Sequence, residues 1–471
     1  MKNVRTRFAP SPTGLMHIGN IRTALLNYIF AIKNKGTCVL RIEDTDPKRN
    51  FDPGAEKIQQ HLSWLNLTFQ EGPQSGGSYA PYFQSQRTSI YQEHLDYLKE
   101  QDFLYRCFCT AQELETKRQR QIAMKKPPRY DGTCRKLTFE QVQHKLAEKI
   151  PFIWRMKVNH SQKISFNDLA RNTLNFDLKN FSDFPVTRED GSFTFVFANC
   201  VDDIAMNITH VLRGEDHLTN TVSQVVLVQA FGKEVPTFWH LSILCNKTGK
   251  KLSKRDQGFS LEDLKTAGFL PEAICNYLGI IGGSFENEIM SLPELIEAYN
   301  FDSIHSTSQV RYDLEKLTWI NHKWIAQYDL ASLTNLCKPY LEKEYNISQL
   351  SHETLQCLVK AVQTDMQTLQ DIVKLVKFYF NRPKITKQEL STTIDSVKID
   401  NLISMLTNQH GSWEHFSTYL KDEAKKHNIS NKELFSSIRI LLTGNSKGLQ
   451  IHDLFVCLGQ KEFFARLTTT Q

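Results

Sequence analysis

The first part of the chain alternates a short strand, a helix and a second strand, and this pattern restricts the fold more than any other feature. Residues 4–8 read as a strand, and apolar residues recur at helical spacing across residues 18–33. Gly36 would end that helix, and residues 38–42 read as the next strand. Two strands connected by one helix form a βαβ unit with parallel strands. We therefore expect an α/β fold built on a parallel sheet.

Two changes of pattern further along indicate several domains, as expected for 471 residues. After residue 104 the chain becomes irregular and mixes β-rich pieces with a basic run, which indicates an α+β insertion. The alternation then resumes, with residues 193–197 and 210–213 as strands. From residue 261 the chain is mostly helical. The predicted organisation is a Rossmann-type parallel sheet in two halves (1–104 and 191–260), an insertion (105–190), a first helical region (261–320) and an all-α domain (321–471).

Two local signals support the helical prediction for the last third of the chain. Apolar residues from Leu355 to Val373 keep one face of a helix, which we attribute to core packing. Ser430 and Glu433 have the spacing of a capping box, which would open another helix.

Composition bounds the setting in which the protein works. The net charge is +6, from 57 basic and 51 acidic side chains, which permits a polyanionic partner without requiring one. The 10 cysteines are mostly isolated, and Pro10 and Pro12 stand where a signal peptide needs apolar residues. No segment approaches the roughly 20 apolar residues of a membrane span. We expect a cytoplasmic protein with reduced thiols and no membrane contact.

A motif rich in turn residues, residues 10–20, lies between the first strand and its helix. In parallel sheets, ligands bind outside the carboxyl ends of the strands and beside helix amino termini. Gly14 and Gly19 would let the backbone approach a nucleotide closely, and His17 would meet its phosphates at the positive end of the helix. Taken alone, a histidine at a helix start is more often structural.

A second motif, Lys-Lys-Leu-Ser-Lys-Arg at residues 250–255, lies between Gly249 and Gly258. Basic side chains on a loop suit a pyrophosphate leaving group, because negative charge builds there during attack on the α-phosphate. Taken alone, such a run is usually an exposed patch.

Together the two motifs resemble the signature pair of the class I aminoacyl-tRNA synthetases. Other segments stand in the order and spacing of the bacterial-type glutamyl enzymes, and they are spread over nearly the whole chain. These segments are residues 7–14, 41–46, 201–203, 213–217, 269–273, 312–317 and 442–444.

This resemblance implies a glutamate–tRNA ligase. The glutamate carboxylate attacks the α-phosphate of ATP, with Mg²⁺ assisting, and the 3′-terminal adenosine of tRNA-Glu then accepts the glutamyl group. No covalent nucleophile on the protein is needed, so the rate must come from positioning and charge stabilisation. The implied catalytic residues are His17 and Lys254. The implied ATP-binding residues are Thr13, Gly19, Lys251 and Lys254.

The resemblance also implies a pocket for L-glutamate. Arginine is a direct way to read a side-chain carboxylate, and the family positions correspond to Arg7 and Arg213. Without the surrounding motifs, either arginine would be read as part of an ion pair. Phe195 stands where the family usually has tyrosine, so a hydroxyl contact is missing or comes from elsewhere. The remaining implied glutamate-binding residues are Ser11, Glu43 and Asn199.

Cys107, Cys109 and Cys134 have a spacing found at zinc sites in a subset of these enzymes. Three thiolates need a fourth ligand, and Tyr130 matches the tyrosine ligand of a shorter relative. The alternative is a zinc module that has lost its metal and kept its cysteines. In either case the basic run at residues 117–136 is suited to gripping the tRNA acceptor end through phosphate contacts.

The resemblance assigns acceptor binding to residues 105–190, stem contacts to residues 261–320 and anticodon binding to residues 321–471. Some relatives restricted to tRNA-Glu carry an arginine just before a Thr-Leu pair, and residues 363–369 contain no arginine. We therefore expect charging of tRNA-Gln as well, with a tRNA-dependent amidotransferase as a functional partner. A monomer is expected.

Three other readings compete. A shorter glutamyl-queuosine-type paralogue would lack the helical part after residue 320, and a small-molecule nucleotidyltransferase would have no use for it. A non-catalytic RNA-binding scaffold derived from a synthetase would not need the intact set His17, Lys254, Arg7 and Arg213.

Overall fold

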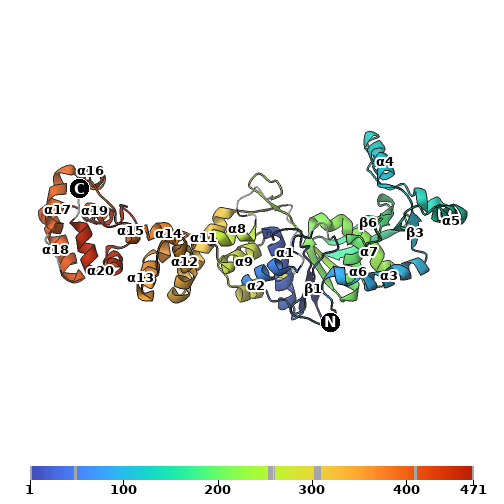
Figure 1. Cartoon of the computed structure of the whole chain (residues 1–471), viewed down its shortest axis with the longest axis horizontal. Coiled ribbons are helices and arrows are strands. Elements are labelled where there is room, and N and C mark those ends of the chain that lie inside the picture. Colours follow the sequence, from blue (N-terminus) through green and yellow to red (C-terminus); the bar gives the residue numbers. More distant parts are fainter. Residues whose placement is uncertain are drawn as a thin grey trace. The chain divides into compact units, whose positions relative to one another are not determined.

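The structure is a computed structural model that describes residues 3–46, 50–52, 54–252, 258, 260–301, 309–407 and 411–468 (Figure 1). It divides into two compact units. The first unit comprises residues 1–262 and 275–313, and the second comprises residues 263–274 and 314–471. The fold class is the predicted one: a mixed α/β part with a parallel sheet, followed by an all-helical part.

Parallel strands form the centre of the first unit. Strand β1 (Arg5–Phe8) pairs with β2 (Thr37–Leu40), and helix α1 (Ile18–Lys33) connects them as predicted. Strand β8 (His210–Gly214) pairs in parallel with β9 (Thr237–Leu241). The backbone N–H of Thr209 donates to the carbonyl of Arg5 at 3.0 Å, so β8 begins beside β1. The carboxyl ends of β1 and β8 therefore lie at the same edge of the sheet.

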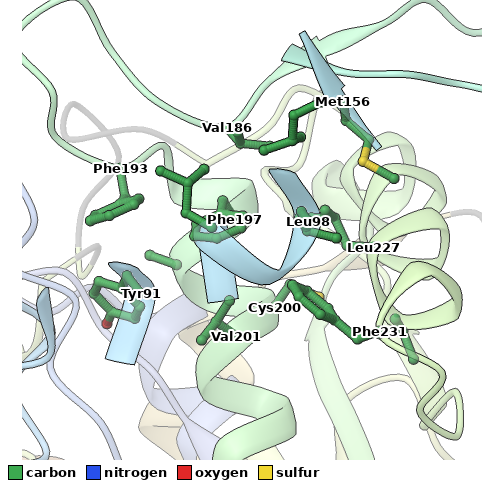
Figure 2. Packing of buried hydrophobic residues seen from close by; sticks show 14 residues of the cluster. Tyr91, Leu98, Met156, Val186, Phe193, Phe197, Cys200, Val201, Leu227 and Phe231 are labelled. Carbon is green, nitrogen blue, oxygen red and sulfur yellow. The ribbon is translucent and has the colours of Figure 1, made fainter. Parts of the chain in front are cut away.

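Helix α6 (Phe195–Ala205) begins where the sequence predicted a strand at residues 193–197, so that prediction is wrong. Phe193, Phe197 and Val201 recur every four residues and pack into one apolar cluster with residues of α3 (Thr88–Glu100) and α7 (Leu218–Ala230), as Figure 2 shows. This period of about four residues is helical, and it outweighs the β propensity of the phenylalanines.

An antiparallel sheet organises the region predicted as an insertion. It has the order β3 (Leu104–Cys107), β4 (Ile153–Met156) and β7 (Phe184–Pro185). Helices α4 (Ala111–Ala123) and α5 (Phe139–Ala147) lie between β3 and β4 in the chain, and neither has a fully buried residue.

Strands β5 (Lys163–Asp168) and β6 (Asn172–Asp177) also fall within this region, but they extend the parallel sheet. The two strands pair with each other in antiparallel orientation, and β5 joins β9 through the pair Asp168 and Phe238. The chain therefore returns to the central sheet before residues 105–190 end.

Helices make up the second unit. The apolar stripe is buried as predicted from Leu355 to Leu369 and ends at half-buried Val373, but it is divided between α13 (His352–Val362), a 3-10 turn and α14 (Asp371–Leu375). The helix breaks because the N–H of Leu369 donates to the carbonyl of Gly268 at 2.9 Å. The capping box at Ser430 opens α19 (Asn431–Thr443), as predicted.

The remaining strands and helices are short connectors of the first unit or members of the helical part. They are α2 (Glu56–Trp64), β10 (Leu244–Cys245), α8 (Leu261–Thr266), α9 (Pro271–Ile280), α10 (Leu292–Ala298), β11 (Val310–Arg311), α11 (Leu314–Gln327), α12 (Leu330–Glu344), α15 (Lys377–Phe380), α16 (Lys387–Leu390), α17 (Ser396–Thr407), α18 (Trp413–Lys426) and α20 (Ile451–Leu467). Among the described residues, no helix is both long and apolar enough to cross a membrane.

Candidate active site

Three arginines and two carboxylates meet at the carboxyl ends of the parallel strands. Arg41, which follows β2, donates from Nη1 to Asp203 Oδ1 at 2.7 Å and from Nη2 to Glu43 Oε1 at 3.1 Å. Arg7, on β1, donates from Nε to the same oxygen of Asp203 at 3.1 Å. All four side chains are buried. Burial alone would raise the pKa of Asp203, but Arg7 and Arg41 more than offset it and hold that pKa below its usual value.

A chain of side-chain amides links Glu43 to the third arginine, Arg213 of β8. Asn199 donates to Glu43 Oε1 at 2.5 Å, and Gln224 donates to Asn199 Oδ1 at 2.7 Å. Arg213 Nη2 donates to Gln224 Oε1 at 2.6 Å. The predicted residues Glu43, Asn199 and Arg213 therefore belong to one buried hydrogen-bond network.

Arg213 has unused hydrogen-bonding capacity in this network. Its Nε and Nη1 are buried and have no hydrogen-bond partner within the described part of the chain. Burial, and then repulsion from Arg7, lower the pKa of Arg213. A buried donor without an acceptor is costly, and more so when it carries charge. This arrangement favours an additional anionic group beside Arg213.

The first sequence motif forms the amino terminus of α1. His17 is the N-cap: its Nδ1 accepts from the N–H of Asn20 at 3.2 Å, and Asn20 accepts from the N–H of His17 at 3.3 Å. Gly19 makes room for this ring, because a Cβ at that position would lie 3.0 Å from it. Burial, and then Lys251, lower the pKa of His17, so its ring is neutral at pH 7 and carries the proton on Nε2.

The residues that follow the second motif in the chain pair with the first motif. His17 forms a β-bridge with Ser260, and the N–H of Leu261 donates to the carbonyl of Met16 at 3.1 Å. Lys251 is exposed, and its Nζ lies 3.3 Å from Asp216 Oδ2. Lys254 lies outside the described residues. The fold therefore places Ser260 and Leu261 beside the first motif, although they lie about 240 residues further along the chain.

The other predicted residues lie on the rim of this site. Ser11 and Thr13 are exposed on the loop after β1, where the N–H of Thr13 donates to the carbonyl of Ser11 at 2.8 Å. Phe195 is half-buried, and its ring centroid lies 5.4 Å from that of His217.

Sequence reasoning missed two polar residues of α7 that contact Arg213. Thr221 and Gln224 both accept hydrogen bonds from Arg213 Nη2, each at 2.6 Å. They stand three residues apart on one face of α7 and are the polar residues of this helix that are buried, and this spacing was the available signal.

The cysteine cluster is a separate site at the end of β3. The sulfur atoms of Cys107, Cys109 and Cys134 all lie within 4.8 Å of one another. Tyr130 Oη lies 3.3 Å from the sulfur of Cys107 and 3.9 Å from that of Cys109. A hydrogen bond with Cys134 lowers the pKa of Cys107, although burial opposes this. The predicted set of four ligands is therefore gathered in one place.

Comparisons with known proteins agree over the whole chain. A family model described as tRNA synthetases class I (E and Q), catalytic domain, matches residues 3–319, and an anticodon binding domain model matches residues 332–470. A glutamate–tRNA ligase of Exiguobacterium sibiricum is 38% identical, covering 99% of this chain and 100% of the relative. A glutamate–tRNA ligase of Bacillus subtilis is 35% identical, covering 98% of this chain and 99% of the relative.

A solved structure is similar over the same length. The crystal structure of a glutamate tRNA ligase from Elizabethkingia meningosepticum in complex with its amino acid matches with a TM-score of 0.89 at 30% identity. The match covers 99% of this chain and 98% of that chain.

Proposed function

The chain belongs to the class I tRNA synthetases, within them to the glutamate–tRNA ligases, and we propose that it activates glutamate with ATP at the site around Arg7, Arg213 and His17. Its substrates are glutamate, ATP and tRNA. A non-catalytic scaffold is not favoured, because full-length relatives carry the ligase name.

The observation that carries the assignment of the glutamate site is the pair of unpartnered donors on Arg213. A γ-carboxylate beside Nε and Nη1 would supply the missing acceptor and the missing counter-charge. A glutamine side chain would leave the charge of Arg213 uncompensated, which is how such a pocket rejects an uncharged isostere. Arg7 contributes a second positive charge, and Glu43 with Asn199 would take the α-amino end of the substrate.

Two covalent steps follow from these positions. An oxygen of the glutamate α-carboxylate bonds to the α-phosphorus of ATP, and the bond to the β-phosphate breaks to release pyrophosphate. The terminal ribose hydroxyl of tRNA then attacks the acyl carbon, loses its proton, and AMP leaves. His17 Nε2 would donate to a phosphate oxygen, and Lys251 with Lys254 would stabilise the pyrophosphate charge. Mg²⁺, bound together with ATP, would neutralise part of the phosphate charge.

Arg213→Gln tests this assignment. Loss of one charged contact to the substrate should raise the glutamate KM at least about 100-fold, with an ATP KM within about twofold of the wild type. The measurement is glutamate-dependent pyrophosphate exchange in the presence of tRNA. Gln229→Ala, at an exposed polar position on the same helix α7, is the control. An unchanged glutamate KM in Arg213→Gln would remove Arg213 from the glutamate site.

We assign zinc to the cluster of Cys107, Cys109, Cys134 and Tyr130. Three thiol sulfurs and a phenol oxygen in one group are a donor set that suits a closed tetrahedral zinc site. The metal would be structural, since it would tie the segment at residue 130–134 to the end of β3. Exposed α4 with the basic residues 117–136 would then contact the tRNA acceptor end.

The wider predictions complete the proposal. The domain bounds given above, a cytoplasmic location, a monomeric state and a link to an amidotransferase stay predictions. Charging of tRNA-Gln is supported by the absence of arginine from residues 363–369, in which the side chain of Gln367 is exposed.

A further inference from the structure

A second buried hydrogen-bond chain begins at Arg213 Nη2, the nitrogen that also donates to Gln224 in the link with Glu43. Thr221 Oγ1 accepts from Arg213 Nη2 at 2.6 Å and lies 2.7 Å from His240 Nε2. The other ring nitrogen of His240, Nδ1, lies 2.7 Å from Asp168 Oδ2. These residues come from α7, β9 and β5, and all are nearly inaccessible to solvent. Nothing in the reaction as described above uses them.

The protonation states determine which group donates in each hydrogen bond of this chain. Burial would raise the pKa of Asp168, but the hydrogen bonds from His240 reverse the effect and hold it below its usual value. Burial lowers the pKa of His240. A neutral His240 that donates from Nδ1 to the Asp168 carboxylate must accept at Nε2. The hydroxyl of Thr221 has one proton, and it lies closer to this nitrogen, at 2.7 Å, than to the carbonyl of His217, at 3.2 Å, so we assign the proton to the bond with His240. The lone pairs of the Thr221 oxygen are then left to accept from Arg213.

Asp168 and His240, at the far end of the hydrogen-bond chain from Arg213, are held by further contacts. Asp168 Oδ1 accepts from the backbone N–H groups of Ala170 and Arg171, both at 3.0 Å. The N–H of His240 donates to Asp168 Oδ2 at 3.0 Å, and the ring of Phe238 stacks on His240 with an interplanar angle of 14°. Because Asp168 fixes His240, and His240 orients the hydroxyl of Thr221, the oxygen that accepts from Arg213 has one defined position.

The position of Arg213 makes such a restraint necessary. The negative charges of Glu43 and Asp203 raise the pKa of Arg213, although burial and Arg7 lower it more, so a guanidinium that turned toward either carboxylate would be less available to a substrate. The hydrogen bond to Thr221 holds one nitrogen on the side of α7 and works against a direct ion pair with either carboxylate.

We propose that Thr221, His240 and Asp168 are positioning residues for glutamate recognition, which hold the Arg213 guanidinium so that its Nε and Nη1 stay available to the substrate carboxylate. This inference rests on the proposed role of Arg213 as the glutamate-binding arginine. It assigns to β5, which lies far from the two signature motifs in sequence, a part in substrate selection.

The test compares Thr221→Val with Thr221→Ser by steady-state aminoacylation. Valine keeps the shape but removes the acceptor, and a hydrogen bond to a charged group is worth enough to raise the glutamate KM about tenfold. We expect kcat and the ATP KM to stay within about twofold. Serine keeps the hydroxyl and should restore the glutamate KM to within about twofold of the wild type.

Thr334→Val is the matched control for loss of a buried threonine hydroxyl. Thr334 lies on α12 and donates to the carbonyl of Leu330 four residues earlier, as Thr221 can to His217. This variant should keep the wild-type glutamate KM. Asp168→Asn is the second probe, because it allows the His240 ring to reverse its tautomer and turn a donor toward Thr221. It should raise the glutamate KM several-fold.

Three outcomes would overturn the proposal. They are an unchanged glutamate KM in both Thr221→Val and Asp168→Asn, equal impairment of the serine and valine variants, and a parallel rise of the glutamate and ATP KM values.

A double-mutant cycle with Arg213→Lys separates this inference from the proposed function. Thr221→Val should add less than about twofold in the Arg213→Lys background, and a full additional tenfold effect would overturn the inference. An Arg213→Lys variant with a wild-type glutamate KM would instead overturn the role of Arg213 itself, and the inference with it.

Discussion

Adjacent carboxylates on α6 share Arg41, whose Nε lies 3.7 Å from Asp202 Oδ2, but their other partners differ. Asp203 accepts from Arg7 and Arg41 at the site, whereas Asp202 accepts from Arg87 Nε at 2.6 Å and from Tyr91 Oη at 2.9 Å. Consecutive helical residues point about 100° apart, so one turn of α6 can complete the site and also fasten α3. We expect Asp203 to matter for substrate binding and Asp202 for stability.

Asp202→Asn should lower the free energy of unfolding by about 3–5 kcal/mol, because it removes one partner of a fully buried ion pair. The shift of the denaturation midpoint, followed by tryptophan fluorescence, measures this effect. Asp96→Asn is the control on the neighbouring helix: it breaks the exposed pair with Lys99 and should leave the denaturation midpoint close to that of the wild type. Equal losses in the two variants would contradict the structural role of Asp202.

At the scale of single residues, the sequence indicated which groups bind but not which groups hold them. Arg7, Glu43 and Arg213 could be named because they stand in motifs. Thr221 and His240 lie outside every motif, and their roles depend on β5 and β9 lying side by side. A contact between strands about 70 residues apart follows from sheet topology, which local patterns do not specify.

At the scale of elements, periodicity predicted burial better than it predicted secondary structure. Phe193 to Phe197 reads equally well as a strand or as the start of a helix, and the continuation to Val201 decides for α6. The stripe from Leu355 to Val373 was read correctly as core, but Asn321 and Gly268 bind the backbone near residue 367 and interrupt the helix. Long-range partners of this kind override local propensity.

The cysteine cluster gives a prediction for one element. We expect about one zinc ion per chain in protein purified without chelator, measured by mass spectrometry, and loss of the metal together with a lower melting temperature in Cys109→Ser. Cys357→Ser, which alters another half-buried free thiol on α13, should keep both the metal and the melting temperature. Metal-free wild-type protein with an unchanged melting temperature would mean that hydrogen bonds alone hold the cluster.

At the scale of the whole molecule, the predicted α/β and all-helical parts are both present, and relatives of the same family align with the chain from end to end. The patterns separated the two parts, whereas the roles assigned to them came from the resemblance to the glutamyl enzymes. The bounds of the insertion are harder to derive, since β5 and β6 follow the antiparallel strands β3 and β4 without a change in composition.

The complete enzyme should charge both tRNA-Glu and tRNA-Gln. Gln367→Arg places an arginine before the Thr-Leu pair on an exposed position, and we expect it to lower charging of tRNA-Gln about tenfold or more while tRNA-Glu charging changes little. Aminoacylation of the two purified tRNAs measures this ratio. Gln370→Arg adds the same charge three residues away and serves as the control. A wild-type enzyme that leaves tRNA-Gln uncharged would refute the prediction.

The pairing of β5 with β9 also sets a limit on protein engineering. A chimaera that exchanged residues 105–190 as one cassette would import a foreign edge for the central sheet, and it would replace Asp168 together with helices α4 and α5. The segment between β3 and β4, residues 108–152, contributes no strand to the central sheet. Donor sequences grafted there would alter helices α4 and α5 and leave β5 and Asp168, which support the proposed glutamate pocket, unchanged.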